Sequence, residues 1–221
     1  MRFFQRTWAF LFSALLLQLI FNPCLETEFG VAGKWILISL NSLVVIAIIH
    51  KLTLGRIRFI VAVLLGIPTL VLYWIPRSPA LDLAMSILTG SLYLYAVLLL
   101  LPYLLRAHRI GIDELFGASS LYILIGLTWA LLYLVLEITI PGSFHIADAQ
   151  NPDGALYLGD FTYYSFVTLT TLGYGDLVPV TCQARSLAVL EAVSGLLTLS
   201  VVFARIVSLY AAQLFEADKK T

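Results

Sequence analysis

Charged residues are scarce in this sequence: Asp, Glu, Lys and Arg make up 12% of its 221 residues, whereas 61% are hydrophobic. A soluble domain could not hide that much apolar surface, so the composition argues against a soluble protein. Several apolar runs approach the roughly 20 residues needed to cross a bilayer. We therefore expect a multi-pass protein of the cell membrane. The net charge of zero says little about partners; we expect lipid around the protein and no nucleic acid.

Cysteine is also rare. Cys24 and Cys182 are the two cysteines of the chain, and neither lies in a Cys-x-x-Cys pattern. Because metal and redox sites usually use such clusters, we expect no metal site and no resident cofactor. A disulfide between the two residues is one interpretation, and two unpaired thiols is the simpler one.

Long apolar runs are the main feature that is present. Six could span a membrane, at residues 4–21, 35–50, 59–75, 81–105, 118–140 and 186–210. A shorter segment, 161–171, is too short to cross and is typical of a re-entrant helix, which a bilayer tolerates only where protein surrounds it. Asp160 is a candidate N-cap for this helix. The polar connection 141–159 predicts an exposed loop, with His145 in solvent.

The distribution of basic residues predicts the orientation of the spans. If both termini are cytoplasmic, ten of the thirteen Lys and Arg residues fall inside, and Lys34, Arg77 and Arg185 fall outside. The ten inside are Arg2, Arg6, Lys51, Arg56, Arg58, Arg106, Arg109, Arg205, Lys219 and Lys220. Arg2 and Arg6 before an apolar run resemble a signal peptide, but no small-residue cleavage site follows, so we expect a retained first span.

The stretch Thr168-Leu169-Thr170-Thr171-Leu172-Gly173-Tyr174-Gly175-Asp176 carries the most specific signal. A ring of backbone carbonyls can replace the water of a potassium ion when several copies of such a loop face one axis. Carbonyls of successive residues can all point inward only if the backbone alternates between unusual conformations. Gly173 and Gly175 permit this, because glycine reaches positive φ at little steric cost.

This stretch resembles the selectivity filter of the tetrameric potassium channels, whose usual core reads Thr-Val-Gly-Tyr-Gly. Leu172 stands here in place of the valine. The resemblance is specific from about residue 160 to residue 210. It implies an all-α membrane protein in which Thr171, Leu172, Gly173, Tyr174 and Gly175 coordinate K⁺ as the permeant ion. Because one chain carries one such loop, it also implies a homotetramer.

Several residues around the loop are candidates for supporting it. They are Thr170, Asp176, Tyr163, Tyr164 and Glu191, with Phe166 as a further aromatic packing residue. Glu191 is the most unusual, because an ionisable residue inside an apolar span is a functional candidate by default. We expect it behind the filter, bonded to threonine or tyrosine hydroxyls of the short helix or to filter amides, with Arg185 as a possible ion partner.

The last span holds candidates for gating. Gly195 lies midway along it and is either a hinge, as in related channels, or a site of close helix packing. Leu196, Leu199, Phe203 and Val207 follow on one helical face and are candidates for an apolar pore lining or gate. Lipid or core contact is the alternative for this face.

The resemblance divides the chain into a pore domain at 111–221 and a four-helix domain at 1–110 that is similar to a degenerate voltage sensor. The fourth span has no Lys or Arg from 83 to 105, so we expect no steep voltage dependence. We also expect no soluble ligand-binding domain after the sixth span.

We therefore expect a potassium-selective channel that is not an enzyme. A less selective cation channel of the same fold is the main alternative. A remote one is an intramembrane aspartyl protease, because Gly173-Tyr174-Gly175-Asp176 also fits a Gly-x-Gly-Asp motif. Such an enzyme needs a second aspartate inside a neighbouring span, and Asp82 and Asp160 lie at segment edges.

Overall fold

The computed structural model describes residues 7–27, 30–51, 56–75, 78–107, 111–146 and 154–218. Nearly all of these residues are helical, in agreement with the expected all-α class. The helices are α1 (Thr7–Thr27), α2 (Gly30–Lys51), α3 (Arg56–Tyr73), α4 (Pro79–Leu105), α5 (Ile112–Thr139), α6 (Leu158–Leu169) and α7 (Cys182–Asp218). Two short strands, β1 (Phe144–Ile146) and β2 (Leu177–Pro179), flank α6 in the chain.

Four of these helices are long and apolar enough to cross a membrane: α3, α4, α5 and the part Cys182–Gln213 of α7. The segments Trp8–Phe21 and Trp35–Ile49 of α1 and α2 are apolar but shorter. Each predicted span therefore coincides with a helix, although α1 extends beyond residue 21 and α7 begins before residue 186 and continues past 210.

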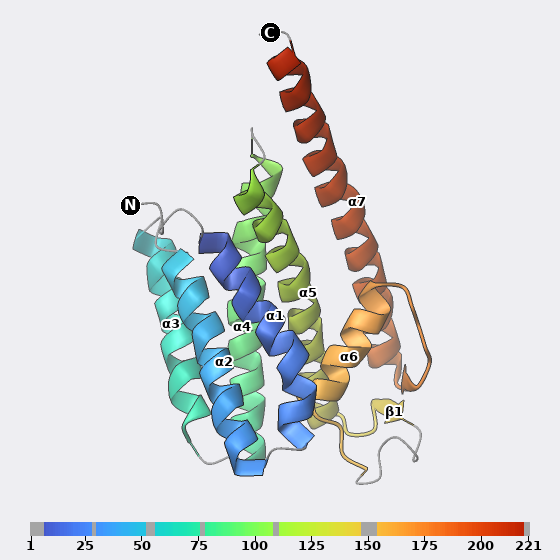
Figure 1. Ribbon diagram of the computed structural model, residues 1–221. Helices are drawn as coiled ribbons and strands as arrows, with labels where there is room; N and C mark the ends of the chain where they lie inside the picture. The colour runs from blue at the N-terminus through green and yellow to red at the C-terminus, as the bar shows by residue number, and fades with distance from the viewer. Residues whose placement is uncertain are drawn as a thin grey trace.

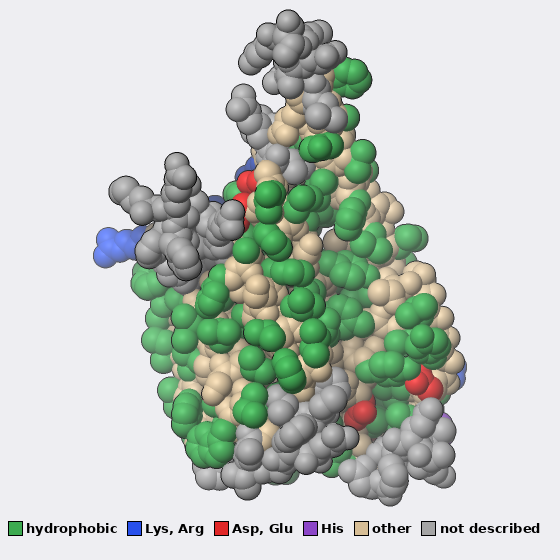
Figure 2. Space-filling model, viewed as in Figure 1, with side chains coloured by type: hydrophobic (Ala, Val, Ile, Leu, Met, Phe, Trp, Pro, Cys, Tyr) green, Lys and Arg blue, Asp and Glu red, His purple; other side chains and the backbone are tan. Residues whose placement is uncertain are grey.

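Helices α1 to α5 pack side by side, whereas α7 stands along one flank and extends beyond them at its C-terminal end (Figure 1). The main hydrophobic core lies among α1, α2, α4 and α5, with Leu15, Val44, Leu92 and Leu121 fully buried. Apolar side chains cover most of the visible surface between the two ends, as expected for a face in contact with lipid (Figure 2).

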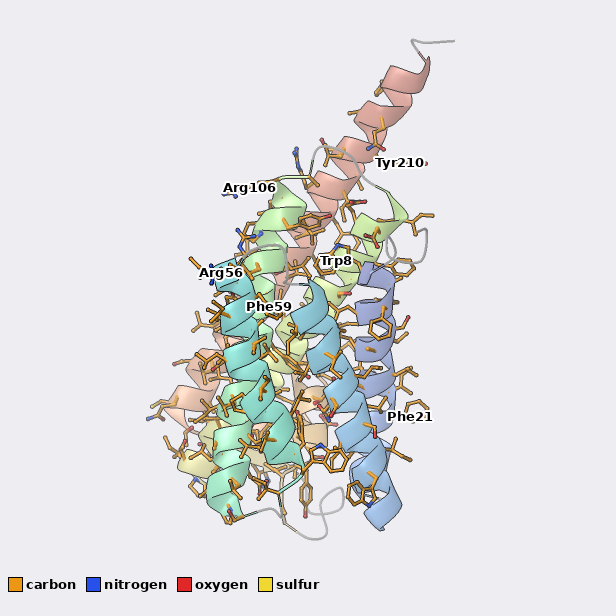
Figure 3. All side chains as sticks on the ribbon, turned by 90° about the vertical axis from the view of Figure 1, so that its left-hand side faces the viewer. Trp8, Phe21, Arg56, Phe59, Arg106 and Tyr210 are labelled. Carbon is orange, nitrogen blue, oxygen red and sulfur yellow. The ribbon has the colours of Figure 1, made fainter. Side chains whose placement is uncertain are left out.

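The start of α1 and the end of α7 lie at the same end of the molecule (Figure 1). Arg56, at the start of α3, and Arg106, just after α4, also lie at this end (Figure 3). The alternation of helix directions thus brings described basic residues to one end, as the orientation argument requires. Lys34, Lys51 and His50 have no described side chains, and Arg2, Arg6, Arg77, His108, Arg109, Lys219 and Lys220 lie outside the described residues.

The segments before and after α6 lie at the same end of the molecule. Strands β1, which precedes α6, and β2, which follows it, pair antiparallel with His145 opposite Val178. The exposed loop expected over 141–159 instead contains a strand at 144–146 in which Phe144 is buried, whereas His145 is exposed as expected. The alternation of Phe144, His145 and Ile146 is too short to identify a strand without its partner.

Candidate functional site

Helix α6 is fixed at its start by a different residue from the one that the sequence suggested. Tyr157 is the N-cap, and Asp160 lies three residues into the helix. The Tyr157 backbone N–H donates to Asp160 Oδ2 at 2.8 Å. Asp160 therefore reaches back to the cap, as acidic residues at this position commonly do, and is not the N-cap itself.

An aromatic cluster holds the first half of α6 against α5 and β1. The ring of Tyr133 lies edge-on to those of Phe144 and Tyr164, with centroids 5.3 and 5.2 Å away. Phe144 makes a similar contact with Phe161 at 5.0 Å. Edge-to-face contacts of this kind fix ring orientation as well as burying area. Of the residues expected to surround the filter, Tyr164 thus packs inside this cluster.

The second half of α6 approaches α5 and α7 where those helices carry glycine. A Cβ on Gly126 of α5 would lie 2.6 Å from Phe166 Cζ. A Cβ on Gly195 of α7 would lie 3.0 Å from the carbonyl oxygen of Leu169 and 3.2 Å from its Cα. Both glycines therefore allow close approach. For Gly195 this conformation shows the packing role, within a helix that is continuous from Cys182 to Asp218.

The loop after α6 has the backbone pattern that the sequence predicts. Thr171, Gly173 and Gly175 have φ of 61°, 59° and 78°, while Leu172 and Tyr174 are not in the positive region. The sign of φ therefore alternates residue by residue through 171–175, which we call the filter loop. Its start is tied to α6, because Leu172 and Gly173 both donate from their backbone N–H to the Val167 carbonyl oxygen, at 3.0 and 3.3 Å.

The filter loop is exposed in the single chain. All residues from Thr170 to Gly175 are exposed, and a Cβ on Gly173 or Gly175 would meet nothing within 4 Å. Within one chain the carbonyls of this loop have no ring of partners around them. In the single chain the loop therefore has its backbone conformation but no residues that cover it.

The end of the filter loop is anchored by one carboxylate. Tyr163 donates its hydroxyl proton to Asp176 Oδ2 at 2.5 Å, and the Leu177 backbone N–H donates to Oδ1 at 3.0 Å. The ring of Tyr163 also stacks on Tyr174 at 6.5 Å. The Tyr163 hydrogen bond lowers the pKa of Asp176, and the same bond raises the pKa of Tyr163 to about 12. Tyr163 thus connects α6 to both sides of Gly175.

Glu191 of α7 is completely buried behind α6. Tyr133 of α5 donates its hydroxyl proton to Glu191 Oε2 at 2.5 Å. The hydroxyl of Ser165 of α6 lies 2.5 Å from Glu191 Oε1 and 2.8 Å from the Gly126 carbonyl oxygen. The carboxylate therefore joins α5, α6 and α7 at one point.

The partners of Glu191 differ from the expected ones. They are a serine of α6 and a tyrosine of α5, not threonine or tyrosine hydroxyls of α6 or filter amides. Arg185 does not pair with Glu191; its side chain donates to the Pro179 carbonyl oxygen at 3.3 Å. Ser165 and Tyr133 could not be predicted as partners of Glu191, because spacing along one helix does not show which residues face one another across three helices.

Two further residues lie near the site. Glu137 accepts hydrogen bonds from the backbone N–H groups of Gly142 and Phe144 at 2.7 and 3.1 Å, and so fixes the turn into β1. Cys182 is a free, exposed cysteine. The side chain of Cys24 lies outside the described residues.

The face of α7 that the sequence suggested as a pore lining is largely uncovered in the single chain. Leu196, Phe203 and Val207 are exposed, and Leu199 is half-buried. In contrast, Arg205 between them is partly buried and donates to the Ala107 carbonyl oxygen at 3.2 Å.

Comparison with known proteins identifies this part of the chain. Residues 121–212 match the family model described as "Ion channel". Protein LctB of Bacillus caldotenax is 30% identical over 101 residues, which cover 45% of this chain and 75% of LctB. The chain belongs to the ion channel family. Protein LctB of Geobacillus stearothermophilus is 29% identical over 118 residues, which cover 51% of this chain and 79% of that protein. No solved structure matches the chain.

The ion channel domain therefore begins in α5 and contains α6, the filter loop, β2 and most of α7. Every contact of Glu191, Ser165 and Asp176 described above falls within it. The match supports ion channel activity for this multi-helix membrane protein, in agreement with the coarser part of the expectation from sequence.

Proposed function

We propose that this protein is a potassium-selective channel that conducts K⁺ passively across the cell membrane. The observation that carries the proposal is the alternating φ of Thr171, Gly173 and Gly175 in the sequence Thr-Leu-Gly-Tyr-Gly. Such alternation turns successive carbonyls to one side of the backbone. Several carbonyl rings in line can take the place of the water around a potassium ion.

The proposed assembly is a homotetramer with its axis along the filter loops. One chain supplies one loop, and a ring of carbonyls needs about four. The exposure of the loop and of most of α7 supports this arrangement, since a helix that is apolar nearly all round needs lipid or protein on its uncovered faces. Leu196, Leu199, Phe203 and Val207 would then line the inner pore, and Gly195 would be the point at which α7 bends if it opens.

The proposed topology has six spans, α1 to α5 and α7, with α6 re-entrant and both termini in the cytoplasm. The return of the chain at β1 and β2 supports the re-entrant helix. Arg56 and Arg106, which share one end of the molecule with the start of α1 and the end of α7, support the orientation. In this topology residues 1–110 form a four-helix domain without a string of arginines, so opening is not steeply voltage-dependent.

Two other functions remain as outcomes of the test. A channel of the same fold with weak selectivity would arise if Leu172 loosens the packing behind the filter loop. A protease is disfavoured, because the described contacts of Asp176 come from the Tyr163 hydroxyl and backbone N–H groups, while Asp160 serves the start of α6.

The experiment is ion flux from liposomes that contain the purified protein. With potassium inside, we expect rapid efflux, and little efflux when sodium replaces potassium. Equal rates for the two ions would support the weakly selective channel instead. Cleavage of membrane peptides without ion flux would support the protease.

A further inference from the structure

A cleft between the four-helix domain and the pore domain has the features of a ligand site. Its volume is about 830 Å³, and residues of α1, α2, α3, α4 and α5 line it. Pockets that enclose small ligands commonly have volumes of about 300–1,000 Å³. The cleft is separate from the filter loop, and the proposed conduction path does not use it.

A polar stripe along α4 forms one wall of the cleft. Asp82, Ser86, Thr89 and Tyr93 all line it, and spacings of three and four residues put them on one face of the helix. Further along α4 the buried positions are apolar: Ala96, Val97, Leu100 and Leu104. The polar wall therefore starts at the N-terminal end of α4 and stops near its middle.

The end of the cleft near the middle of α4 carries two buried side-chain amides that can donate further hydrogen bonds. Tyr93 donates to Gln18 Oε1 at 3.2 Å, Gln18 Nε2 donates to Asn41 Oδ1 at 2.8 Å, and Asn41 Nδ2 donates to the Leu37 carbonyl oxygen at 2.8 Å. Gln18 and Asn41 are only 2% and 8% exposed. Each amide nitrogen carries two N–H groups and uses one of them here, so each has a second N–H without a partner among the described residues, and both residues line the cleft.

The rest of the lining is apolar and aromatic. Trp35 of α2 and Trp74 after α3 lie together at the outer end, with ring centroids 5.4 Å apart. Among the described lining residues Asp82 is the only charged one. An anion would meet the Asp82 carboxylate and no basic group among the described lining residues. A cation has no lone pair with which to accept a hydrogen bond from the two amides, and Asp82 lies about three helical turns away from Tyr93 along α4.

We propose that this cleft binds a neutral amphiphile, with its uncharged oxygen head accepting hydrogen bonds from Gln18 and Asn41 and its hydrocarbon part against the tryptophans. The head supplies the acceptors that the two free N–H groups lack, and burial of the hydrocarbon part supplies most of the driving force. The cleft also touches Leu156, Tyr157 and Leu158 at the start of α6. If the proposed function holds, the bound amphiphile therefore also alters channel opening.

The test uses a photoreactive octanol that carries a diazirine, added to the purified full chain in lipid nanodiscs. We expect saturable labelling of peptides that contain cleft residues, mapped by mass spectrometry. Unlabelled octanol should compete, whereas octanoate and octylammonium should compete at least tenfold less well. This readout does not depend on ion flux, so it can succeed or fail separately from the proposed channel function.

Two variants and one control make the test specific. The double change Gln18→Leu with Asn41→Leu removes the donors and should weaken labelling roughly threefold to tenfold, the loss expected for one or two hydrogen bonds. Ser86→Leu should block the cleft by bulk, since Ser86 bonds only to its own helix at Asp82. Ser39→Leu is the control, because Ser39 makes the same kind of bond, to Trp35, on an exposed face outside the cleft.

Labelling that does not saturate, that maps outside the cleft, or that survives Ser86→Leu unchanged would overturn the proposal. Stronger competition by octylammonium than by octanol would overturn the assignment to neutral ligands. If the double variant does not fold, Ser86→Leu and the competition series decide the question.

Discussion

At the residue scale, the filter loop depends on glycine at two positions for its backbone conformation. Gly173 and Gly175 have φ of 59° and 78° with open space around a Cβ, so an added methyl group meets strain and no clash. This conformation costs a residue with a Cβ roughly 1–2 kcal/mol more than it costs glycine. Gly173→Ala and Gly175→Ala should therefore each reduce selective potassium flux at least tenfold while the protein still inserts.

Gly154→Ala is the matched control for this prediction. Gly154 also has positive φ, 67°, and open space, but it lies before α6 and outside the filter loop. Its replacement should leave flux within about twofold of the original protein. Equal loss of flux from all three variants would contradict a special role for residues 171–175.

Glu191 should matter through hydrogen bonding behind the filter loop. Glu191→Gln keeps an acceptor for Tyr133 and a group that can pair with Ser165, so we expect little change in thermal stability. Glu191→Leu leaves those buried hydroxyls without their partner and should lower the free energy of unfolding by about 1–3 kcal/mol. Thermal unfolding in detergent measures both. A leucine variant as stable as the glutamine variant would refute the account of this contact.

The bond between Tyr163 and Asp176 predicts a pH dependence. This bond lowers the pKa of Asp176 below the ordinary value of about 3.9 for an aspartate. The carboxylate therefore protonates only at a lower pH than an unbonded aspartate would. Flux should therefore persist as external pH falls to about 4. Tyr163→Phe removes the bond, raises the pKa of Asp176, and should move the midpoint of acid inhibition to higher pH.

The pH profile of flux from liposomes measures this shift, with Tyr210→Phe, far along α7, as the control. The phenol of Tyr163 should stay protonated up to a pH near 12, so alkaline conditions below that value should leave the bond intact. Identical acid midpoints for the original protein and Tyr163→Phe would show that Asp176 does not govern acid inhibition.

At the scale of elements, the contact between α7 and the end of α6 leaves no room for a side chain at residue 195. A Cβ on Gly195 would lie 2.6 Å from Leu169 Cδ2 and 3.0 Å from the Leu169 carbonyl oxygen. Since backbone must move to accept it, Gly195→Ala should destabilise the protein by about 1–3 kcal/mol. Gly90→Ala in α4 is the control, because its nearest contact would be an ordinary 3.5 Å to Leu131. Unfolding temperatures compare the two variants, and a smaller loss for Gly195→Ala would contradict the packing account.

The sequence predicted elements well where a single segment carries its own pattern. Apolar length identified the helices, and Gly173 with Gly175 predicted the backbone of the filter loop. Features that need two distant segments were missed. The pairing of β1 with β2 joins residues over thirty positions apart, and the bond of Glu191 to Tyr133 depends on how α5 meets α7. The sequence predicted Asp160 as the N-cap, whereas it is the third residue of α6. Acidic residues are common at both positions, and the sequence alone does not show at which residue the helix begins.

At the scale of the whole molecule, the two parts of the chain have different surroundings. Helices α1, α2, α4 and α5 share a core within one chain, whereas the filter loop and most of α7 remain exposed. We propose that the exposed part contacts other copies of the chain. A tetramer in which four filter loops face one axis would make these contacts with the same surface from each copy.

The reversal potential of a planar bilayer containing the purified protein, with potassium on one side and sodium on the other, tests the central claim most directly. If four filter loops form a potassium-selective pore, the current should reverse far from zero, toward the equilibrium potential of potassium. Gly154→Ala should give the same value. A reversal potential near zero with normal single-channel openings would show that the pore does not select potassium and would contradict the account.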